Sequence, residues 1–165
     1  MKEKFQDLLE QNGNLKTGDK AMLTVSDLMT TQIFSLLETD TLYAAKQIME
    51  MARIRHVPIV DEKQHFIGLI THRDMLSVAV SRLSDIDEPT QNEIAAGIPL
   101  REIMRRDVTT ISPETTLREA AEKLLLHKYG CLPVVDPSKK LVGILTEADF
   151  LRLTISLMDA LETRA

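Results

Sequence analysis

The chain of 165 residues is acidic, with 20 lysines and arginines against 25 aspartates and glutamates and a formal charge of −5. This balance argues against general binding of nucleic acid, and an aromatic content of 4% without tryptophan leaves few side chains for base stacking. We expect a cytoplasmic protein without a membrane partner. No apolar run approaches the roughly 18 residues of a membrane helix, and the first residues lack the apolar core of a signal peptide.

Residues 1–20 form a leader with one short amphipathic stretch. Phe5, Leu8 and Leu9 fall on one helical face, and Gly13 between two asparagines ends that helix. Two interpretations stay open: the leader docks on the body or a partner, or it is a frayed terminus.

Residues 21–83 read as a β-α-β-β-α unit. Apolar patterning predicts strands at 33–36, 57–60 and 66–70, a helix with Leu42, Ala45, Met49 and Ala52 on one face, and a second helix from about Thr71. Residues 84–99 are rich in acidic side chains, proline and glycine, which favours a surface connector with one helical turn near 93–96. Residues 100–165 repeat the pattern, with strands at 108–111, 132–135 and 141–145, a helix from Leu117 and a final helix through 150–158.

The two units are copies of one another. Shifting the chain by 75 residues aligns residues 25–76 with 100–151 without a gap, and 11 of 52 aligned positions are identical. A fixed period indicates one supersecondary unit per copy. The sequence therefore predicts an α/β fold in which two β-α-β-β-α repeats pack with pseudo-twofold symmetry, so that Pro58 corresponds to Pro133.

Each copy carries the motif Gly-h-h-Thr-x-x-Asp, where h is apolar, at residues 68–74 and 143–149. Both stand where a predicted strand turns into a helix, and the free N–H groups of a helix start favour an anion. The threonine adds a hydroxyl, and the aspartate one turn later can accept from a vicinal diol, so the set suits a ribose phosphate. An ordinary capping box uses the same two residue types and stays open as an alternative.

With Met29-Thr30 and Val57-Pro58-Ile59-Val60-Asp61, these two motifs resemble a tandem pair of cystathionine-β-synthase (CBS) domains, or Bateman module, over residues 25–80 and 100–158. The resemblance implies clefts that bind AMP, ADP, ATP or S-adenosylmethionine, no obligatory cofactor, and a homodimer. It implies that Asp74 and Asp149 accept from the ribose. It pairs Thr71 and Asp74 with residues 107–109, and Thr146 and Asp149 with residues 31–34. The ligand-binding set it implies is Thr31, Gln32, Ile33, Phe34, Arg55, His56, Val57, Pro58, Thr71, Asp74, Asp107, Val108, Thr109, Leu132, Pro133, Thr146 and Asp149.

The two copies differ where the family often reaches phosphate. Arg55-His56 precedes the proline-containing strand in the first copy, and Gly130-Cys131 stands there in the second. We therefore expect tighter nucleotide binding at a cleft that combines Arg55 and His56 with Thr71 and Asp74. A solvated strand start is the plainer interpretation of the basic pair.

A regulatory module that binds an adenosyl ligand is the leading functional interpretation. A structural or interaction module with empty clefts is the alternative. An enzyme is disfavoured because the sequence shows no catalytic triad, Walker loop or metal-ligand spacing, and Cys131 reads as a small buried side chain. For the dimer interface we expect Val78-Ala79-Val80 and residues 153–158 to contribute apolar surface.

Overall fold

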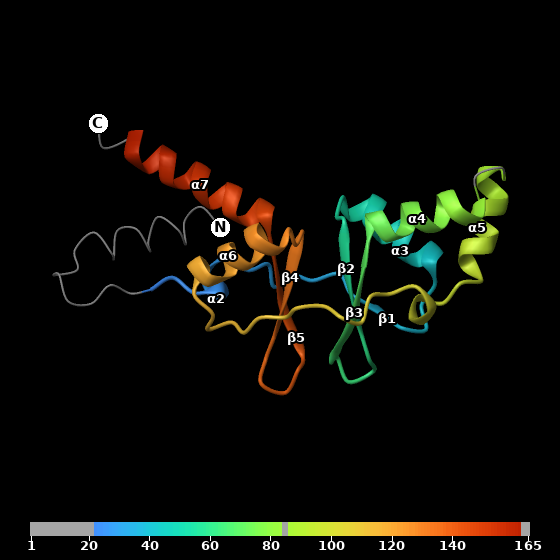
Figure 1. The fold of residues 1–165 in the computed structure, drawn as a ribbon, viewed down its shortest axis with the longest axis horizontal. Helices are drawn as coiled ribbons and strands as arrows, with labels where there is room; N and C mark the ends of the chain where they lie inside the picture. Colours follow the sequence, from blue (N-terminus) through green and yellow to red (C-terminus); the bar gives the residue numbers. More distant parts are fainter. Residues whose placement is uncertain (1–21, 84–85, 163–165) are drawn as a thin grey trace.

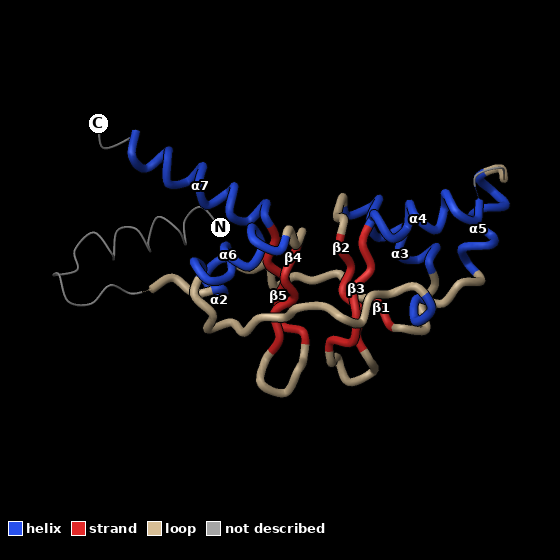
Figure 2. Tube along the Cα trace, viewed as in Figure 1, coloured by secondary structure: helices blue, strands red, loops and turns tan. Residues whose placement is uncertain are grey.

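Two α/β halves lie side by side in the computed structural model, which describes residues 22–83 and 86–162, without the side chains of 79–83 (Figure 1). The predicted leader falls outside the described residues. The strands of both halves gather in the middle of the molecule, and most of the helices lie along one side (Figure 2). This arrangement confirms the predicted fold of two repeats.

The first half holds a mixed sheet of three strands. β1 (Leu36–Leu37) runs parallel to β2 (His56–Val60), which pairs antiparallel with β3 (Phe66–Thr71). Helix α3 (Leu42–Ala52) connects β1 to β2, and its first turn is capped by the Thr41 hydroxyl, which accepts from the amide of Ala44 at 3.3 Å. Helix α4 (His72–Leu83) follows β3 without a break.

The second half repeats these elements. β4 (Cys131–Val135) pairs antiparallel with β5 (Leu141–Thr146), α6 (Leu117–His127) precedes the pair, and α7 (Glu147–Glu162) follows it. The Thr116 hydroxyl caps α6 as Thr41 caps α3.

The backbone repeats its irregularities as well as its elements. Arg53 and Lys128, which are 75 residues apart, both end a helix in the left-handed conformation, and Gln64 and Lys139 share a positive φ in the two hairpin turns. Both hairpins also have a bulge at the same place, after Ile59 and after Val134. Gly68 and Gly143 occupy β3 and β5 at matching positions, so the pseudo-twofold relation holds at the level of single residues.

The first strand of each repeat is shorter than predicted. β1 covers 36–37 instead of 33–36, and the predicted strand at 108–111 is wrong, because only Ile111 bridges to Val134. The Ile111 amide donates to Pro133 at 3.0 Å and its carbonyl accepts from Val135 at 2.9 Å. A second rung would need an N–H from residue 113, and Pro113 has none.

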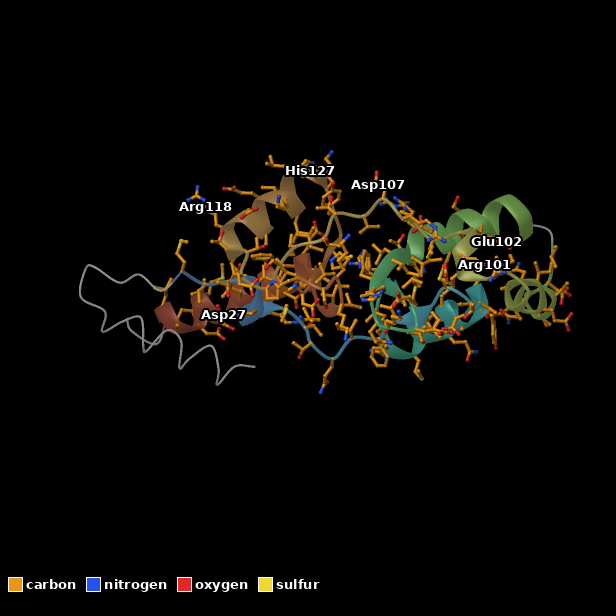
Figure 3. All side chains as sticks on the ribbon, turned by 90° about the horizontal axis from the view of Figure 1, so that it is seen from below. Asp27, Arg101, Glu102, Asp107, Arg118 and His127 are labelled. Atoms are coloured by element: carbon orange, nitrogen blue, oxygen red, sulfur yellow. The ribbon has the colours of Figure 1, made fainter. Side chains whose placement is uncertain are left out.

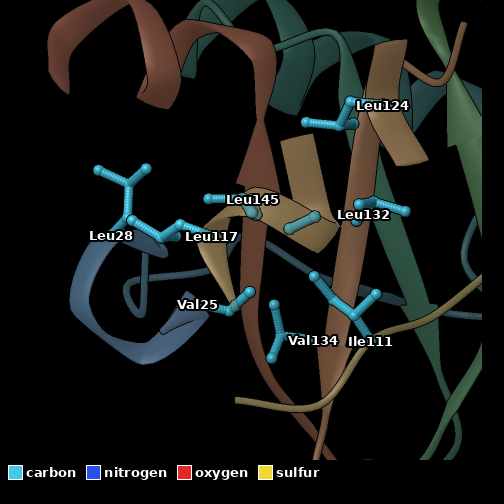
Figure 4. Close-up of a cluster of buried hydrophobic side chains, with 9 residues drawn as sticks. Val25, Leu28, Ile111, Leu117, Leu124, Leu132, Val134 and Leu145 are labelled. Atoms are coloured by element: carbon cyan, nitrogen blue, oxygen red, sulfur yellow. The ribbon is translucent and has the colours of Figure 1, made fainter. Parts of the chain in front are cut away.

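The segment that leads into each repeat packs on the opposite repeat. Val25 and Leu28 of α2 (Val25–Leu28) belong to the core of the second half, together with Leu117, Leu132 and other buried residues (Figure 4). Conversely, Ala95, Leu100 and Met104 belong to the core of the first half. The two halves of the molecule therefore exchange their leading segments.

The predicted connector at 84–99 is more helical than expected, and eight of its described residues are exposed. Residues 88–96 form α5 (Glu88–Ala96), a helix of 9 residues with a proline in its first turn, in place of one turn at 93–96. A short 3-10 helix, η1 (Leu100–Glu102), follows it. Ala95 is 5% exposed and Leu100 is fully buried. The polar and acidic composition of the segment gave no sign that Ala95 would be buried against the first half.

Paired backbone hydrogen bonds join the two halves. Thr30 and Ile144 exchange amide–carbonyl bonds of 2.9 and 3.0 Å, and Leu69 and Arg105 do the same at 2.9 Å each. These contacts bring a chain segment directly over a strand of the other half. A Cβ on Gly68 would lie 2.8 Å from Met104 Sδ and 2.9 Å from the Arg105 carbonyl oxygen, so the motif glycine is required by close approach.

We expect Gly68→Ala to lower the free energy of unfolding by about 1–3 kcal/mol, since the added methyl group meets a backbone oxygen that cannot move alone. Gly143→Ala is the matched variant and should cost less, because the three atoms nearest to its new Cβ all belong to the Met29 side chain, which can rotate. Urea denaturation of both variants measures the difference. A loss for Gly143→Ala as large as that for Gly68→Ala would show that the carbonyl is not the deciding contact.

Candidate functional site

The aspartate of each motif caps the helix that follows it. In the second repeat, Asp149 Oδ2 accepts from the Thr146 amide at 2.7 Å and from its hydroxyl at 2.8 Å. In the first, Asp74 Oδ2 accepts from the Thr71 amide and hydroxyl at 2.9 and 2.6 Å, and the Asp74 amide donates back to the hydroxyl at 3.2 Å. The first repeat therefore has both reciprocal bonds of a capping box, and the second has the bonds to the aspartate side chain.

The other oxygen of each carboxylate is held by an arginine. Arg152, one turn further along α7, donates to Asp149 Oδ1 at 2.6 Å. Arg105, which comes from the opposite half, donates to Asp74 Oδ1 from Nε at 2.7 Å and from Nη2 at 2.5 Å. Each motif thus offers Oδ1 as the acceptor that a ligand would share with a guanidinium.

A pocket of about 240 Å³ opens beside Thr146 and Asp149. The segment Gln32, Ile33 and Phe34 forms one side of it, as the sequence predicted for this motif. Phe34 is 50% exposed, so its ring is accessible at the pocket. The pocket therefore joins elements of both halves.

The basic residues before β2 belong to this same pocket. Arg53, Arg55, His56 and Pro58 line it together with Gly130. His56 is also the strand partner of Thr71, as expected from the predicted grouping with Thr71 and Asp74, so the start of β2 lies between the two motifs. The exchange that brings residues 30–34 to the second motif also brings the start of β2, since both belong to the first half and face the same junction.

His56 contributes little positive charge. Its ring is half-buried against Gly130, where a Cβ would lie 2.5 Å from His56 Nε2. Burial, reinforced by the charge of Arg55, lowers the pKa of His56 below its ordinary value, although Glu147 and Asp74 oppose the shift. The cations that remain at the pocket are the guanidiniums of Arg53, Arg55 and Arg152.

The first motif has different surroundings. Burial alone would raise the pKa of Asp74, but hydrogen bonds from Arg105 and Thr71 hold it below its ordinary value, so the carboxylate is ionised. Asp107 and Thr109 are exposed, and Asp107 lies on the segment that runs between the two halves (Figure 3). Arg105 from the opposite half thus binds Asp74 Oδ1, as Arg152 binds Asp149 Oδ1 in the second repeat.

Some predicted ligand residues face elsewhere. Val57 and Leu132 are fully buried members of the two hydrophobic cores. Pro133 is buried as well, and Thr31 is exposed without lining the pocket. Val108 is half-buried on the segment beside the first motif.

Sequence reasoning missed several pocket residues. Arg53 was hidden because it ends a helix, and Arg152 because it lies one turn beyond the motif. Thr30, Ile144 and Glu147 also line the pocket. The repeat itself could have pointed to the residues of the first half. Because residues 31–34 were already assigned to the second motif, other residues of the first repeat could be expected beside it.

Other chemistry is not supported by the side chains that the structure describes. Within them no group of three or more His, Cys, Asp or Glu could hold a metal ion. Burial raises the pKa of Cys131 to about 12, so this residue is a thiol and not a nucleophilic thiolate. Across residues 22–83 and 86–162, the helices are too short or too polar to cross a membrane.

Comparison with known proteins identifies the repeat. The family model described as "CBS domain" matches residues 25–81 and again residues 100–156. Among curated proteins, a homoserine O-acetyltransferase of Methanocorpusculum labreanum is 34% identical over 140 residues, which are 85% of this chain and 25% of that protein. The chain spans 24–25% of the length of the first curated relatives it matches.

Solved structures share the fold. A Vibrio cholerae protein assigned to acetoin utilization (AcuB) superposes with a TM-score of 0.73 at 40% identity, covering 86% of this chain and 97% of that one. The CBS domain pair of protein MJ0100, in complex with 5′-methylthioadenosine and S-adenosyl-L-methionine, has a TM-score of 0.67 at 26% identity, with 81% and 96% of the two chains covered.

We expect His56→Gln to reduce the loss of stability on acidification. Because the pKa of His56 is lowered in the folded state, the unfolded chain takes up a proton that the folded chain does not, and stability falls as the pH drops below about 6.5. Urea unfolding at about pH 7.5 and about pH 5.5 measures this slope, with the exposed His72→Gln as the control for losing an imidazole. An unchanged slope in His56→Gln would contradict the assignment.

Proposed function

Because the chain belongs to the CBS domain family, we propose that it is a non-catalytic regulatory module that binds an adenosine-containing ligand between its two repeats. The pocket beside Thr146 and Asp149 is the site, and the ligand is an adenine nucleotide or S-adenosylmethionine. Binding would alter how the halves sit against one another, because the pocket is built from both.

One observation carries the proposal. Three guanidiniums and the carboxylate of Asp149, which caps α7, line one pocket of a chain that is acidic overall. Asp149 Oδ1 is the acceptor for the ribose diol. Arg53 and Arg55 supply charge for a phosphate or a carboxylate, and charge-assisted bonds are roughly twice as strong as neutral ones. Phe34 and Ile33 give the base an apolar surface.

The ligands of a relative support the chemistry. The MJ0100 pair, 26% identical to this chain, holds 5′-methylthioadenosine and S-adenosyl-L-methionine. Both contain a ribose with a diol and an adenine base, as the Asp149 pocket requires. AMP, ADP and ATP add phosphate, which suits Arg53 and Arg55.

The proposed site is the cleft that the sequence led us to expect as the weaker one. Arg55 lines the pocket with Asp149. Oδ1 of each aspartate already accepts from an arginine, from two nitrogens of Arg105 at Asp74 and from one nitrogen of Arg152 at Asp149. We propose that the ligand binds more tightly beside Asp149 than beside Asp74.

Self-association remains part of the proposal. Helix α7 exposes Leu151, Ile155, Met158 and Leu161 by 57–70%, and contiguous apolar surface of this kind marks interfaces. Leu153 of the predicted set is instead half-buried against the core of the second half. Of the other predicted set, the side chains of Ala79 and Val80 are outside the description.

We expect Asp149→Asn to weaken AMP binding by about 10- to 100-fold, as for loss of a hydrogen bond to a charged group. Asparagine can still accept from the Thr146 amide, so the helix keeps its cap while the diol loses its acceptor. Isothermal titration gives the affinity. Asp74→Asn is the matched variant in the other repeat and should change AMP binding by less; a larger effect of Asp74→Asn would place the ligand in the other cleft.

We expect Arg55→Ala to weaken binding of AMP much more than binding of adenosine, because adenosine has no phosphate to lose. The same titration with the two ligands separates the charge from the base and ribose contacts. Equal losses for both ligands would remove Arg55 from the phosphate role. Absence of heat with AMP, ATP, adenosine and S-adenosylmethionine in the wild type would favour the interaction module with empty clefts.

A further inference from the structure

A second and larger cavity lies among the helices of the first half. It has a volume of about 530 Å³, within the range of small-molecule sites, and it lies between α3, α4 and α5. Its floor consists of Leu42, Met49 and Ala95, each at most 5% exposed, and Met75 and Leu76 of α4 form a wall. The cavity therefore offers a deep apolar surface outside the adenosyl pocket.

The other repeat carries larger side chains at two of the matching positions. The positions that correspond to Ile54 and Met75 carry Tyr129 and Phe150, and both rings pack against the core of the second half. Larger side chains are thus accommodated at these positions of the same fold. In the first repeat the smaller Ile54 and Met75 pack against the core of the first half and also line the cavity.

Positive charge surrounds one end of the cavity. Arg53 and Arg55 follow the last turn of α3, both are exposed, and neither forms an ion pair among the residues that the structure describes. Lys46 lies further along the wall, where it is held by Glu88 at 3.5 Å and Asn92 at 3.1 Å. Glu50 is the one carboxylate among the described lining residues, so the rim is cationic although the chain is acidic.

We propose that this cavity binds an organic carboxylate with an apolar tail, such as the anion of a medium-chain fatty acid. The carboxylate would lie at Arg53 and Arg55, and the tail would run over Met49, Met75 and Ala95. Apolar burial drives the tail inward, and the guanidiniums select an anion over a cation. The apolar floor lies outside the adenosyl pocket, whereas Arg53, Ile54 and Arg55 line both cavities, so the two anions would share the same guanidiniums.

The test uses decanoate as the probe, below its micelle concentration, with decyltrimethylammonium as the cation of equal chain length. Isothermal titration should show decanoate binding to the full chain, with decyltrimethylammonium at least about tenfold weaker. Met75→Phe, which copies Phe150, should reduce decanoate affinity at least about tenfold by filling the cavity. AMP binding should persist, because Met75 does not line the adenosyl pocket.

A second pair of variants keeps the test independent of core packing. Leu76 is 52% exposed at the cavity wall, and Leu151 is its 65% exposed counterpart in the other repeat. Leu76→Glu should weaken decanoate several-fold by placing a carboxylate at the wall, while Leu151→Glu should leave it unchanged. The proposal is overturned if wild type does not bind decanoate, if the cation binds equally well, or if Met75→Phe and Leu76→Glu both bind decanoate as wild type does.

Discussion

The close approach of each leading segment to a strand of the opposite half is the constraint on which the rest of the structure depends. At two places the backbones exchange a pair of hydrogen bonds, Thr30 with Ile144 and Leu69 with Arg105. Only glycine leaves room beside these contacts, because a Cβ on Gly68 would overlap Met104 and a carbonyl oxygen. The same pair occurs in both repeats, since Met104 lies against Gly68 and Met29 lies against Gly143.

This crossing also explains why one motif can be both structural and functional. The threonine and one aspartate oxygen cap a helix within a single repeat, which needs no ligand. The second oxygen points to an arginine, and residues from the other half reach the same place. The capping box therefore fixes the orientation of the carboxylate that the proposed ligand would use.

Sequence reasoning reached the fold and the motifs because those depend on local rules. Thr41 and Thr116 signalled the starts of α3 and α6, and the period of 75 residues implied the pseudo-symmetry. Sequence reasoning was incomplete where the leading segments exchange between the two halves, because contacts there join residues that are far apart in the sequence. Arg55 was grouped with the first motif alone although it also lines a pocket with the second, and the packing of Ala95 in α5 was masked by polar neighbours. The strand at 108–111 failed for a local reason, the missing N–H of Pro113.

The exchange of leading segments has a consequence for how this molecule could be divided. A cut between α4 and α5 would not yield two autonomous halves, because the N-terminal fragment would keep α2 but lose Ala95, Leu100 and Met104 from its own core. The C-terminal fragment would in turn lack Val25 and Leu28. Each fragment carries the missing piece of the other, so the two are complementary and can complete both cores only when they associate. The unit of folding is therefore the intertwined pair, whatever the boundaries of the sequence repeat.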